Sequence, residues 1–372
     1  MRLTARLSEP YPCQAVPLPG AMPPSLPLLP RLYLGTMTFA WSQASASVDL
    51  PVAISFLSAF HLAGGVHVDT ARIYANGDSE VLLGQALATF PPDTFVLGTK
   101  AHCSLSLSAA GMQAQFDSSL KALKVSRVHD FYLHQPDPNA TLLESLAFAS
   151  NLVKSGKVDR VGMSNYHADE VSRAFELCKS HGLVPPSLYQ GLYNPLNRSV
   201  EQSLLPVLRA NGASFVAYNP LAAGVLAGKH SAGSLSSPPP GRFKNNPNYL
   251  PRFYTASNLA VVENLRLACS LNNVSLLSAT YRWLLLHSAL TPSDGLLLGA
   301  SSPSQLADNL AACEEAKSEK PLPPDVKVAF DEADERVKKG GEEQFFYWRS
   351  FSKDMPAREQ RHHGASYAAG KK

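Results

Sequence analysis

Short runs of apolar or β-branched residues recur along the chain, and each is followed by a longer stretch with helical spacing of apolar residues. This alternation is typical of βαβ units with parallel strands. The predicted strands are 31–37, 66–70, 95–99, 129–134, 160–163, 187–190, 214–218 and 296–299. The predicted helices are 52–63, 79–89, 110–123, 142–155, 168–180, 200–211 and pieces within 258–288.

Eight such alternations predict the α/β class and a (β/α)8 TIM barrel. A doubly wound sheet is the rival architecture, and it is disfavoured because no G-x-G-x-x-G follows any predicted strand. We expect one barrel domain over residues 31–350, an N-terminal extension over 1–30, and a polar, basic C-terminal tail over 351–372. A loop over about 228–255, rich in Pro, Gly, Ser and Asn, interrupts the barrel, and a loop of that length is usually functional or disordered.

Composition narrows the class of protein without deciding its function. The chain has 372 residues, 45% of them hydrophobic, and a formal net charge of +3. A dedicated nucleic-acid binder normally carries a stronger basic excess, so we expect no nucleic-acid partner. No uncharged apolar run approaches the roughly 20 residues that cross a bilayer, so we also expect no membrane partner.

The cysteines and the N-terminus bear on the cellular compartment. Five cysteines are scattered along the chain without CxxC spacing, which disfavours a disulfide scaffold and favours a reducing compartment. Prolines break up the N-terminus before any apolar signal core forms. We expect a cytoplasmic protein; an organelle is the alternative if the extension, with Arg2, Arg6 and few acids, is a transit peptide.

Candidate chemistry follows from the barrel, because such enzymes place the active site at the C-terminal ends of the strands. Those ends carry Asp69, with Tyr74 just beyond it, then Lys100 and His134. Each residue alone has an ordinary explanation as a cap, a solvated tip or a hydrogen-bonded loop residue. Four of them at the ends of successive units favour a catalytic site.

These four groups suit the delivery of a proton to an oxygen while a hydride reaches the attached carbon. The ordinary pKa of tyrosine, about 10, is too high for easy proton exchange at neutral pH. A nearby ammonium lowers that pKa, and a carboxylate paired with the ammonium compensates its buried charge. A histidine can hydrogen-bond the carbonyl oxygen and assist proton transfer.

The same residues belong to motifs that occur in a fixed order. The motifs are VDTARIY at 68–74, SE at 79–80, LG at 83–84, GTM at 35–37, TK at 99–100, FYLH at 131–134, GMSN at 162–165 and YQ at 189–190. The ordered set resembles the aldo-keto reductase family over about residues 31–349. Four further motifs resemble the aflatoxin-aldehyde reductase subgroup: YQGLYN at 189–194, NPLAAGVLAGK at 219–229, GRF at 241–243 and NLAACEE at 309–315.

The resemblance implies a barrel that binds NADPH in an extended pose without a Rossmann fold and reduces a small-molecule carbonyl substrate. It makes Asp69, Tyr74, Lys100 and His134 the catalytic tetrad, with Tyr74 as the general acid. Ser164, Asn165 and Gln190 would hold the nicotinamide carboxamide, and Tyr218 would stack on the nicotinamide ring. Residues 219–229 would wrap the pyrophosphate and 301–309 the adenosine end. The implied cofactor-binding residues are Met37, Ser164, Asn165, Gln190, Tyr218, Asn219, Pro220, Leu221, Gly224, Gly228, Lys229, Arg242, Ser301, Ser302, Gln305 and Asn309. Because the subgroup includes dimers, a homodimer is considered.

The residues themselves also indicate a phosphate site. The small residues of 222–228 let the backbone approach a phosphate, and Lys229 adds positive charge. Ser301 and Ser302 open the helix after the eighth strand, where barrels often bind phosphate, although an ordinary N-cap also explains them. Ser302 and Arg242 could contact a 2′-phosphate, which favours NADPH over NADH.

The substrate end is predicted from aromatic and basic residues near the barrel mouth. The candidate substrate-binding residues are His134, Trp41, Tyr249, Arg252 and Arg349. Arg252 and Arg349 could clamp a carboxylate or a second carbonyl, because arginine suits bidentate recognition. The alternative is that the aromatic cluster at 345–349 only packs across the barrel mouth.

Three functions are weighed. The first is an NADPH-dependent aldehyde/ketone oxidoreductase of the class that acts on the CH-OH group of donors. It would reduce dialdehydes, semialdehydes or aromatic aldehydes to alcohols. The second is a cofactor-binding regulatory subunit resembling potassium-channel β subunits. The third is a metal-dependent hydrolase using His67, Asp69, His102 and His134, but no H-x-x-x-H motif or carboxylate pair supports it, so we expect no metal.

Overall fold

The computed structural model describes residues 29–42, 44, 46–231, 233, 235–236, 238, 243, 250–318, 320–341 and 344–356. Most of the predicted N-terminal extension and of the predicted C-terminal tail lies outside the described residues. The cofactor candidate Arg242 and the substrate candidate Tyr249 lie outside them as well.

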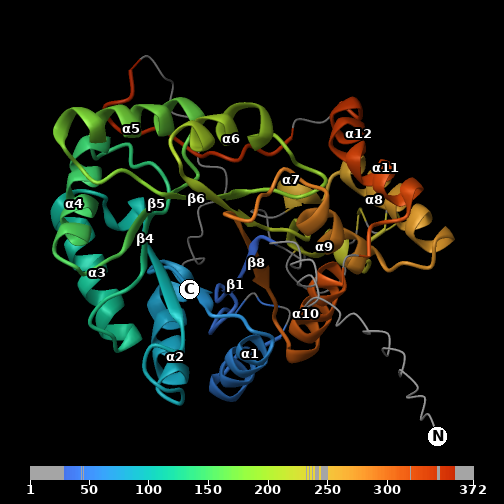
Figure 1. Cartoon of the computed structure of the whole chain (residues 1–372), viewed down its shortest axis with the longest axis horizontal. Helices are drawn as coiled ribbons and strands as arrows, with labels where there is room; N and C mark the ends of the chain where they lie inside the picture. The colour runs from blue at the N-terminus through green and yellow to red at the C-terminus, as the bar shows by residue number, and fades with distance from the viewer. Residues whose placement is uncertain are drawn as a thin grey trace, which may run out of the picture.

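Eight parallel strands close into a barrel (Figure 1). The strands are β1 (Arg31–Gly35), β2 (His67–Asp69), β3 (Val96–Ala101), β4 (Asp130–Leu133), β5 (Arg160–Ser164), β6 (Leu188–Leu192), β7 (Ser214–Tyr218) and β8 (Gly295–Gly299). Each strand pairs with the next, and β1 pairs with β8 from Arg31 opposite Gly295 to Gly35 opposite Gly299. The predicted (β/α)8 fold is confirmed, and the doubly wound alternative is wrong.

Helices cover the outside of the barrel (Figure 1). The main helices are α1 (Leu50–Leu62), α2 (Asp78–Leu87), α3 (Ala109–Leu123), α4 (Leu142–Lys154), α5 (Ala168–His181), α6 (Val200–Ala210), α8 (Ala256–Leu271), α9 (Leu276–Leu286) and α10 (Pro303–Lys317). The shorter helical segments are η1 (Tyr74–Gly77), η2 (Cys103–Leu105), η3 (Ala222–Ala227), α7 (Leu250–Phe253), α11 (Pro324–Asp331) and α12 (Ala333–Lys339). None of the described helices is long and apolar enough to cross a membrane.

Hydroxyl side chains fix where several of these helices begin. Ser108 accepts a hydrogen bond from the Gly111 amide at the start of α3, and Thr141 caps α4 in the same way. Thr255, Ser275 and Ser302 cap α8, α9 and α10. Such caps satisfy amides that the first helical turn leaves without an intrahelical partner.

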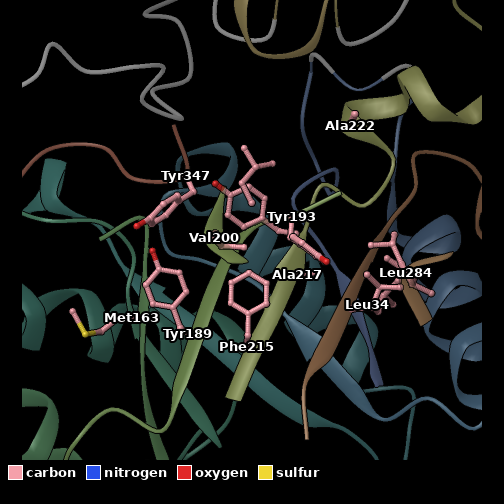
Figure 2. Close-up of a cluster of buried hydrophobic side chains, with 14 of the residues drawn as sticks. Leu34, Met163, Tyr189, Tyr193, Val200, Phe215, Ala217, Ala222, Leu284 and Tyr347 are labelled. Atoms are coloured by element: carbon pink, nitrogen blue, oxygen red, sulfur yellow. The ribbon is translucent and has the colours of Figure 1, made fainter. Parts of the chain in front are cut away.

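The core contains a cluster of large aromatic side chains on the β6 and β7 side of the barrel (Figure 2). Tyr189 and Phe215 stack with ring centroids 6.1 Å apart, and Tyr193 meets Phe215 edge to face. Tyr347, from near the end of the described chain, lies above Tyr189 in the same cluster (Figure 2). Its hydroxyl accepts a hydrogen bond from the Ala168 amide at 3.2 Å.

The C-terminal segment, residues 344–356, is attached to the barrel by hydrogen bonds to several loops and helices. The amide of Arg349 donates to the carbonyl oxygen of Asn165 at 2.9 Å. The amide of Ser352 donates to Glu170 on α5 at 2.9 Å. The segment therefore reaches a residue directly after β5, at the end of the barrel where the site is expected.

Candidate active site

A cavity of about 300 Å³ lies at the C-terminal ends of the strands. It collects most of the predicted site residues, from loops that follow different strands. Those in its wall are Met37, Asp69, Tyr74, His134, Ser164, Asn165, Gln190, Tyr218, Asn219, Pro220, Leu221, Gly224, Lys229, Ser301, Gln305 and Asn309. A cavity of this kind at this end of a (β/α)8 barrel is the expected place for an active site.

A buried ion pair lies at the base of this cavity. Lys100 Nζ donates to Asp69 Oδ2 at 2.5 Å and to the Thr70 carbonyl oxygen at 2.7 Å. The other carboxylate oxygen of Asp69 accepts a hydrogen bond from Gln190 Nε2 at 2.9 Å. Lys100 is fully buried and Asp69 nearly so. Each charge is thus compensated inside the protein, as buried charges require.

Tyr74 and His134 lie next to this pair. Lys100 Nζ is 5.4 Å from the centroid of the Tyr74 ring, and the rings of Tyr74 and His134 are 5.7 Å apart at 80°. Burial lowers the pKa of His134 well below its usual 6.5, and His102, Lys100 and Arg349 lower it further. The imidazole of His134 is therefore neutral at pH 7.

The turn that carries Tyr74 is held by a second, partly buried ion pair. Glu80 on α2 binds Arg72 Nη1 at 2.6 Å through one oxygen and accepts from Thr99 Oγ1 at 2.6 Å through the other. Gly77 ends the turn with φ +103°, and a Cβ on it would collide with the Arg72 guanidinium. These contacts fix the direction in which the chain leaves β2, and so the position of Tyr74.

A hydrogen-bonded network continues around the cavity wall. Asn165 Nδ2 donates to the His134 carbonyl oxygen at 2.8 Å and to Ser164 Oγ at 3.0 Å. Tyr218 donates from its hydroxyl to Asn165 Oδ1 at 2.8 Å. Asn165 is therefore oriented by groups from β4, β5 and β7, and its amide direction is set before any ligand arrives.

The segment after β7 has unusual backbone geometry. Asn219, Ala222, Ala223 and Gly224 all have positive φ, from 48° at Ala222 to 110° at Gly224. Segments in which left-handed and right-handed residues follow one another turn backbone amides toward a common concavity that can hold an anion. Lys229, in the cavity wall at the end of this segment, brings a positive charge.

The start of α10 forms the adjoining wall. The side-chain oxygen of Gln305 accepts from the Ser301 amide at 3.0 Å, and Asn309 Nδ2 donates to the Gly299 carbonyl oxygen at 3.1 Å. Ser302 is the N-cap, accepting from the Gln305 amide at 3.3 Å. Of the two serines for which an ordinary N-cap was the alternative to a phosphate site, Ser302 is the N-cap of α10. Ser301 lines the cavity together with Gln305 and Asn309.

Some predicted residues lie away from the cavity wall. Gly228, Ser302 and Trp41 do not line it, and Trp41 packs against the hydrophobic core. The guanidinium groups of Arg252 and Arg349 lie 4.6 and 4.5 Å from the ring centroid of Phe345. Both arginines are buried and outside the wall. The structure therefore brings the two together around one ring.

Other wall residues were not predicted from the sequence. They are Gly35, Thr38, His230, Phe243, Leu277, Tyr281, Leu297, Gly299 and Ala300, whereas Ala223, Ala227 and Asp308 fall within the predicted cofactor segments 219–229 and 301–309. Leu277 and Tyr281 belong to α9, whose apolar spacing indicated only a packing helix.

No group of three or more His, Cys, Asp or Glu side chains in the described part of the chain is placed to hold a metal ion. Of the residues considered for a metal site, His67 packs instead against Tyr33, with ring centroids 4.7 Å apart. Burial lowers the pKa of His67 to about 4. The described residues thus give no support to the hydrolase alternative.

A buried lysine–aspartate pair beside a tyrosine and a histidine in a (β/α)8 barrel is the arrangement that the resemblance to the aldo-keto reductases led us to expect. The chain belongs to the aldo/keto reductase family, whose sequence profile matches residues 31–323. Aflatoxin B1 aldehyde reductase member 2 of Rattus norvegicus is 38% identical over 341 residues, covering 88% of this chain and 90% of the relative. Aldo-keto reductase family 7 member A3 of Homo sapiens is 38% identical over 318 residues, covering 82% and 93%. Oxidoreductase sirO of Leptosphaeria maculans is 35% identical over 274 residues, covering 71% and 81%.

Proposed function

We propose that this protein is an NADPH-dependent reductase that converts aldehydes to primary alcohols, with Tyr74 as the general acid. The observation that carries the proposal is the buried Lys100–Asp69 pair beside Tyr74, in which Asp69 lines the same cavity as Tyr74 and His134. An ammonium held at this position favours the ionised form of a neighbouring phenol, which makes the phenol a better proton donor near neutral pH.

The residues of the cavity fit a nicotinamide dinucleotide, which supplies the hydride for the carbonyl carbon. Ser164, Asn165 and Gln190 offer amide and hydroxyl groups for the carboxamide beside Tyr74, and Tyr218 offers a ring face. The positive-φ backbone of residues 222–224 would hold the pyrophosphate, and the start of α10 the adenosine end.

The proton step uses groups of this chain. The neutral His134 ring can donate a hydrogen bond to the substrate carbonyl oxygen without adding a charge. Tyr74 transfers its hydroxyl proton to that oxygen, which leaves an alcohol and a phenolate beside Lys100. The phenolate is stabilised by the ammonium until solvent returns the proton.

The preference for NADPH is a further part of the proposal. Lys229 lies in the cavity wall and supplies positive charge, and Arg242 and Ser302 remain the sequence-based candidates for the 2′-phosphate. A 2′-phosphate adds negative charge to the ligand, so cationic contacts favour it over the free hydroxyl of NADH.

The aldehyde class rests on two relatives. The rat relative above and a human one are named aflatoxin B1 aldehyde reductases. We propose that His134 contacts the carbonyl and that Arg349, whose amide binds Asn165, borders the substrate with Trp41, Tyr249 and Arg252. We also propose a cytoplasmic location, a homodimer, and the division into an extension over 1–30, a barrel over 31–350 and a tail over 351–372.

The experiment is a steady-state screen of NADPH and NADH against aldehydes, starting with 4-nitrobenzaldehyde. The wild-type protein should oxidise NADPH with at least one aldehyde, and Tyr74→Phe should lose more than about 100-fold in kcat, the range typical of general acid catalysis. Tight NADPH binding without turnover of any carbonyl would overturn the reductase assignment and favour the regulatory-subunit alternative.

A further inference from the structure

Tyr132 on β4 lies between Lys100 on β3 and Gly162 on β5 in the register of the barrel sheet. Lys100 is the partner of Tyr132 across β3 and β4, and Gly162 is its partner across β4 and β5. Residues paired across neighbouring strands direct their side chains to the same face of a sheet. The side chain of Tyr132 therefore shares a face with that of Lys100, the buried lysine of the candidate active site.

The place of the Tyr132 ring depends on the missing side chain at position 162. A Cβ on Gly162 would collide with the Cδ1, Cε1 and Cγ atoms of the ring. The ring thus lies over the backbone of its β5 neighbour, in space that any other residue at position 162 would fill. Because the side chain is also buried, packing confines the ring to this place beside Lys100.

The Lys100 ammonium contacts two aromatic rings. Its Nζ atom lies 5.5 Å from the centroid of the Tyr132 ring and 5.4 Å from that of the Tyr74 ring. Both distances are within cation–π range, and the attraction is stronger where water is excluded. The hydrogen bonds of Nζ to Asp69 and to the Thr70 carbonyl oxygen come from the end of β2. Tyr132 contacts the ammonium from β4 instead.

The hydroxyl group of Tyr132 does not account for the tyrosine at this position. Its oxygen is buried and has no hydrogen-bond partner among the described residues. Burial, followed by the charge of Asp130, raises the pKa of Tyr132 well above 10.0, so the phenol is neutral. The other charged or titratable groups that act on it are Tyr33, Asp69 and Arg160, and Arg160 binds both oxygens of Asp130 at 2.8 and 2.9 Å. Tyr132 therefore acts on Lys100 through its ring rather than through a charge.

We propose that Tyr132 is a positioning residue of the reductase site, whose ring holds the Lys100 ammonium in place beside Tyr74. The inference rests on the proposed function, in which that ammonium makes Tyr74 a better proton donor. Without the ring, the ammonium loses a contact that keeps it near Tyr74, and Tyr74 then ionises at a higher pH. Tyr132 does not line the cavity, so its effect passes through Lys100.

The first test separates the ring from the hydroxyl. Tyr132→Phe keeps the ring, whereas Tyr132→Met replaces it with a flexible side chain that fills irregular gaps. Tyrosinate absorbance of the ligand-free protein, minus that of the same protein with Tyr74→Phe, gives the pH at which Tyr74 ionises. This pH should rise by about one pH unit in Tyr132→Met and stay at the wild-type value in Tyr132→Phe.

Steady-state reduction of 4-nitrobenzaldehyde gives a second readout of the same variants. In Tyr132→Met the high-pH limb of the kcat profile should move in the same direction as the titration of Tyr74. Its kcat at pH 7 should fall about 10-fold, because a weaker acid transfers its proton more slowly. The dissociation constant of NADPH should stay unchanged. His134 and the Arg72–Glu80 pair, the other titratable groups around Tyr74, are retained in every variant.

A pair of glycine substitutions provides the control for packing. Gly162→Ala displaces the ring while tyrosine 132 is retained, so it should reproduce the shift of Tyr132→Met. Gly191→Ala is its match, because a Cβ there would lie 2.7 Å from Phe215 and 2.9 Å from Tyr189 in the aromatic cluster of Figure 2. Both variants should lower the melting temperature. Only Gly162→Ala should change the titration of Tyr74.

An unchanged titration of Tyr74 in folded Tyr132→Met overturns the inference, since the ring then only packs. An equal shift in Tyr132→Phe overturns it by assigning the effect to the hydroxyl, and an equal shift in Gly191→Ala by assigning it to any disturbance of the core. A wild-type protein that reduces no carbonyl removes the proposed function itself. The titration of Tyr74 needs no turnover and still decides whether Tyr132 holds Lys100 in place.

Discussion

Glu170 on α5 accepts a hydrogen bond from the Ser352 amide at 2.9 Å and thereby attaches the C-terminal segment to the barrel. Burial raises the pKa of the Glu170 carboxyl from 4.5 to about 7, although hydrogen bonds from Ser352 and the charge of Arg173 act in the opposite direction. The contact that holds the segment thus includes a group that titrates near neutral pH.

The elevated pKa predicts a slope in the pH dependence of stability. Between pH 4.5 and about 7 the folded protein keeps the Glu170 proton and the unfolded chain loses it, so stability falls as pH rises and then levels off. Glu170→Gln should remove this slope and gain about 3 kcal/mol over the wild type above pH 7. Urea unfolding at a series of pH values measures it. Glu176→Gln, at an exposed position of the same helix, is the control and should keep the wild-type slope.

The Lys100–Asp69 pair predicts strong coupling between two substitutions. Lys100→Met leaves the Asp69 carboxylate buried without its cation, and the expected loss is about 3–5 kcal/mol of unfolding free energy. Asp69→Asn should also destabilise the protein. The double variant should lose clearly less than the sum, because no uncompensated charge remains. Additive losses in a denaturant-based double-mutant cycle would contradict the role given to the pair.

The position of Gly77 predicts that a substitution there will disturb the turn that carries Tyr74. Gly77→Ala places a Cβ against the Arg72 guanidinium at a positive φ, so both strain and a displaced ion pair are expected. Reductase activity should fall more steeply than stability. Gly156→Ala is the matched control, because Gly156 also has positive φ but open space around it. It should cost about 1 kcal/mol and leave kcat unchanged.

The position of Lys229 in the cavity wall predicts that its charge contributes to cofactor binding in a salt-dependent way. Lys229→Ala should raise the dissociation constant of NADPH about 10-fold at low ionic strength, and the difference should shrink as salt is added. Fluorescence titrations at several salt concentrations measure this. Lys121→Ala, an exposed position on α3, should bind as the wild type does. A loss that does not depend on salt would argue against a charge interaction with phosphate.

Strand order and barrel closure were predictable because parallel strands buried on both faces leave continuous apolar runs, as at 214–218. The proximity of Asp69 and Lys100 followed from the fold, since neighbouring parallel strands end at the same side. The position of Tyr281 in the cavity wall and the packing of Arg252 and Arg349 against Phe345 could not be predicted from the sequence. Their contacts depend on side-chain direction and on segments far apart in sequence, which periodicity does not encode.

The pairing of β1 with β8 has a consequence for biosynthesis. Arg31 on β1 pairs with Gly295 on β8, so the barrel can close only after the ribosome has synthesised β8. Until then the nascent chain presents two open sheet edges, which are templates for pairing with other chains. Contacts so distant in sequence also form slowly. Newly made chains of this protein should therefore depend on chaperone protection until residue 299 has left the exit tunnel.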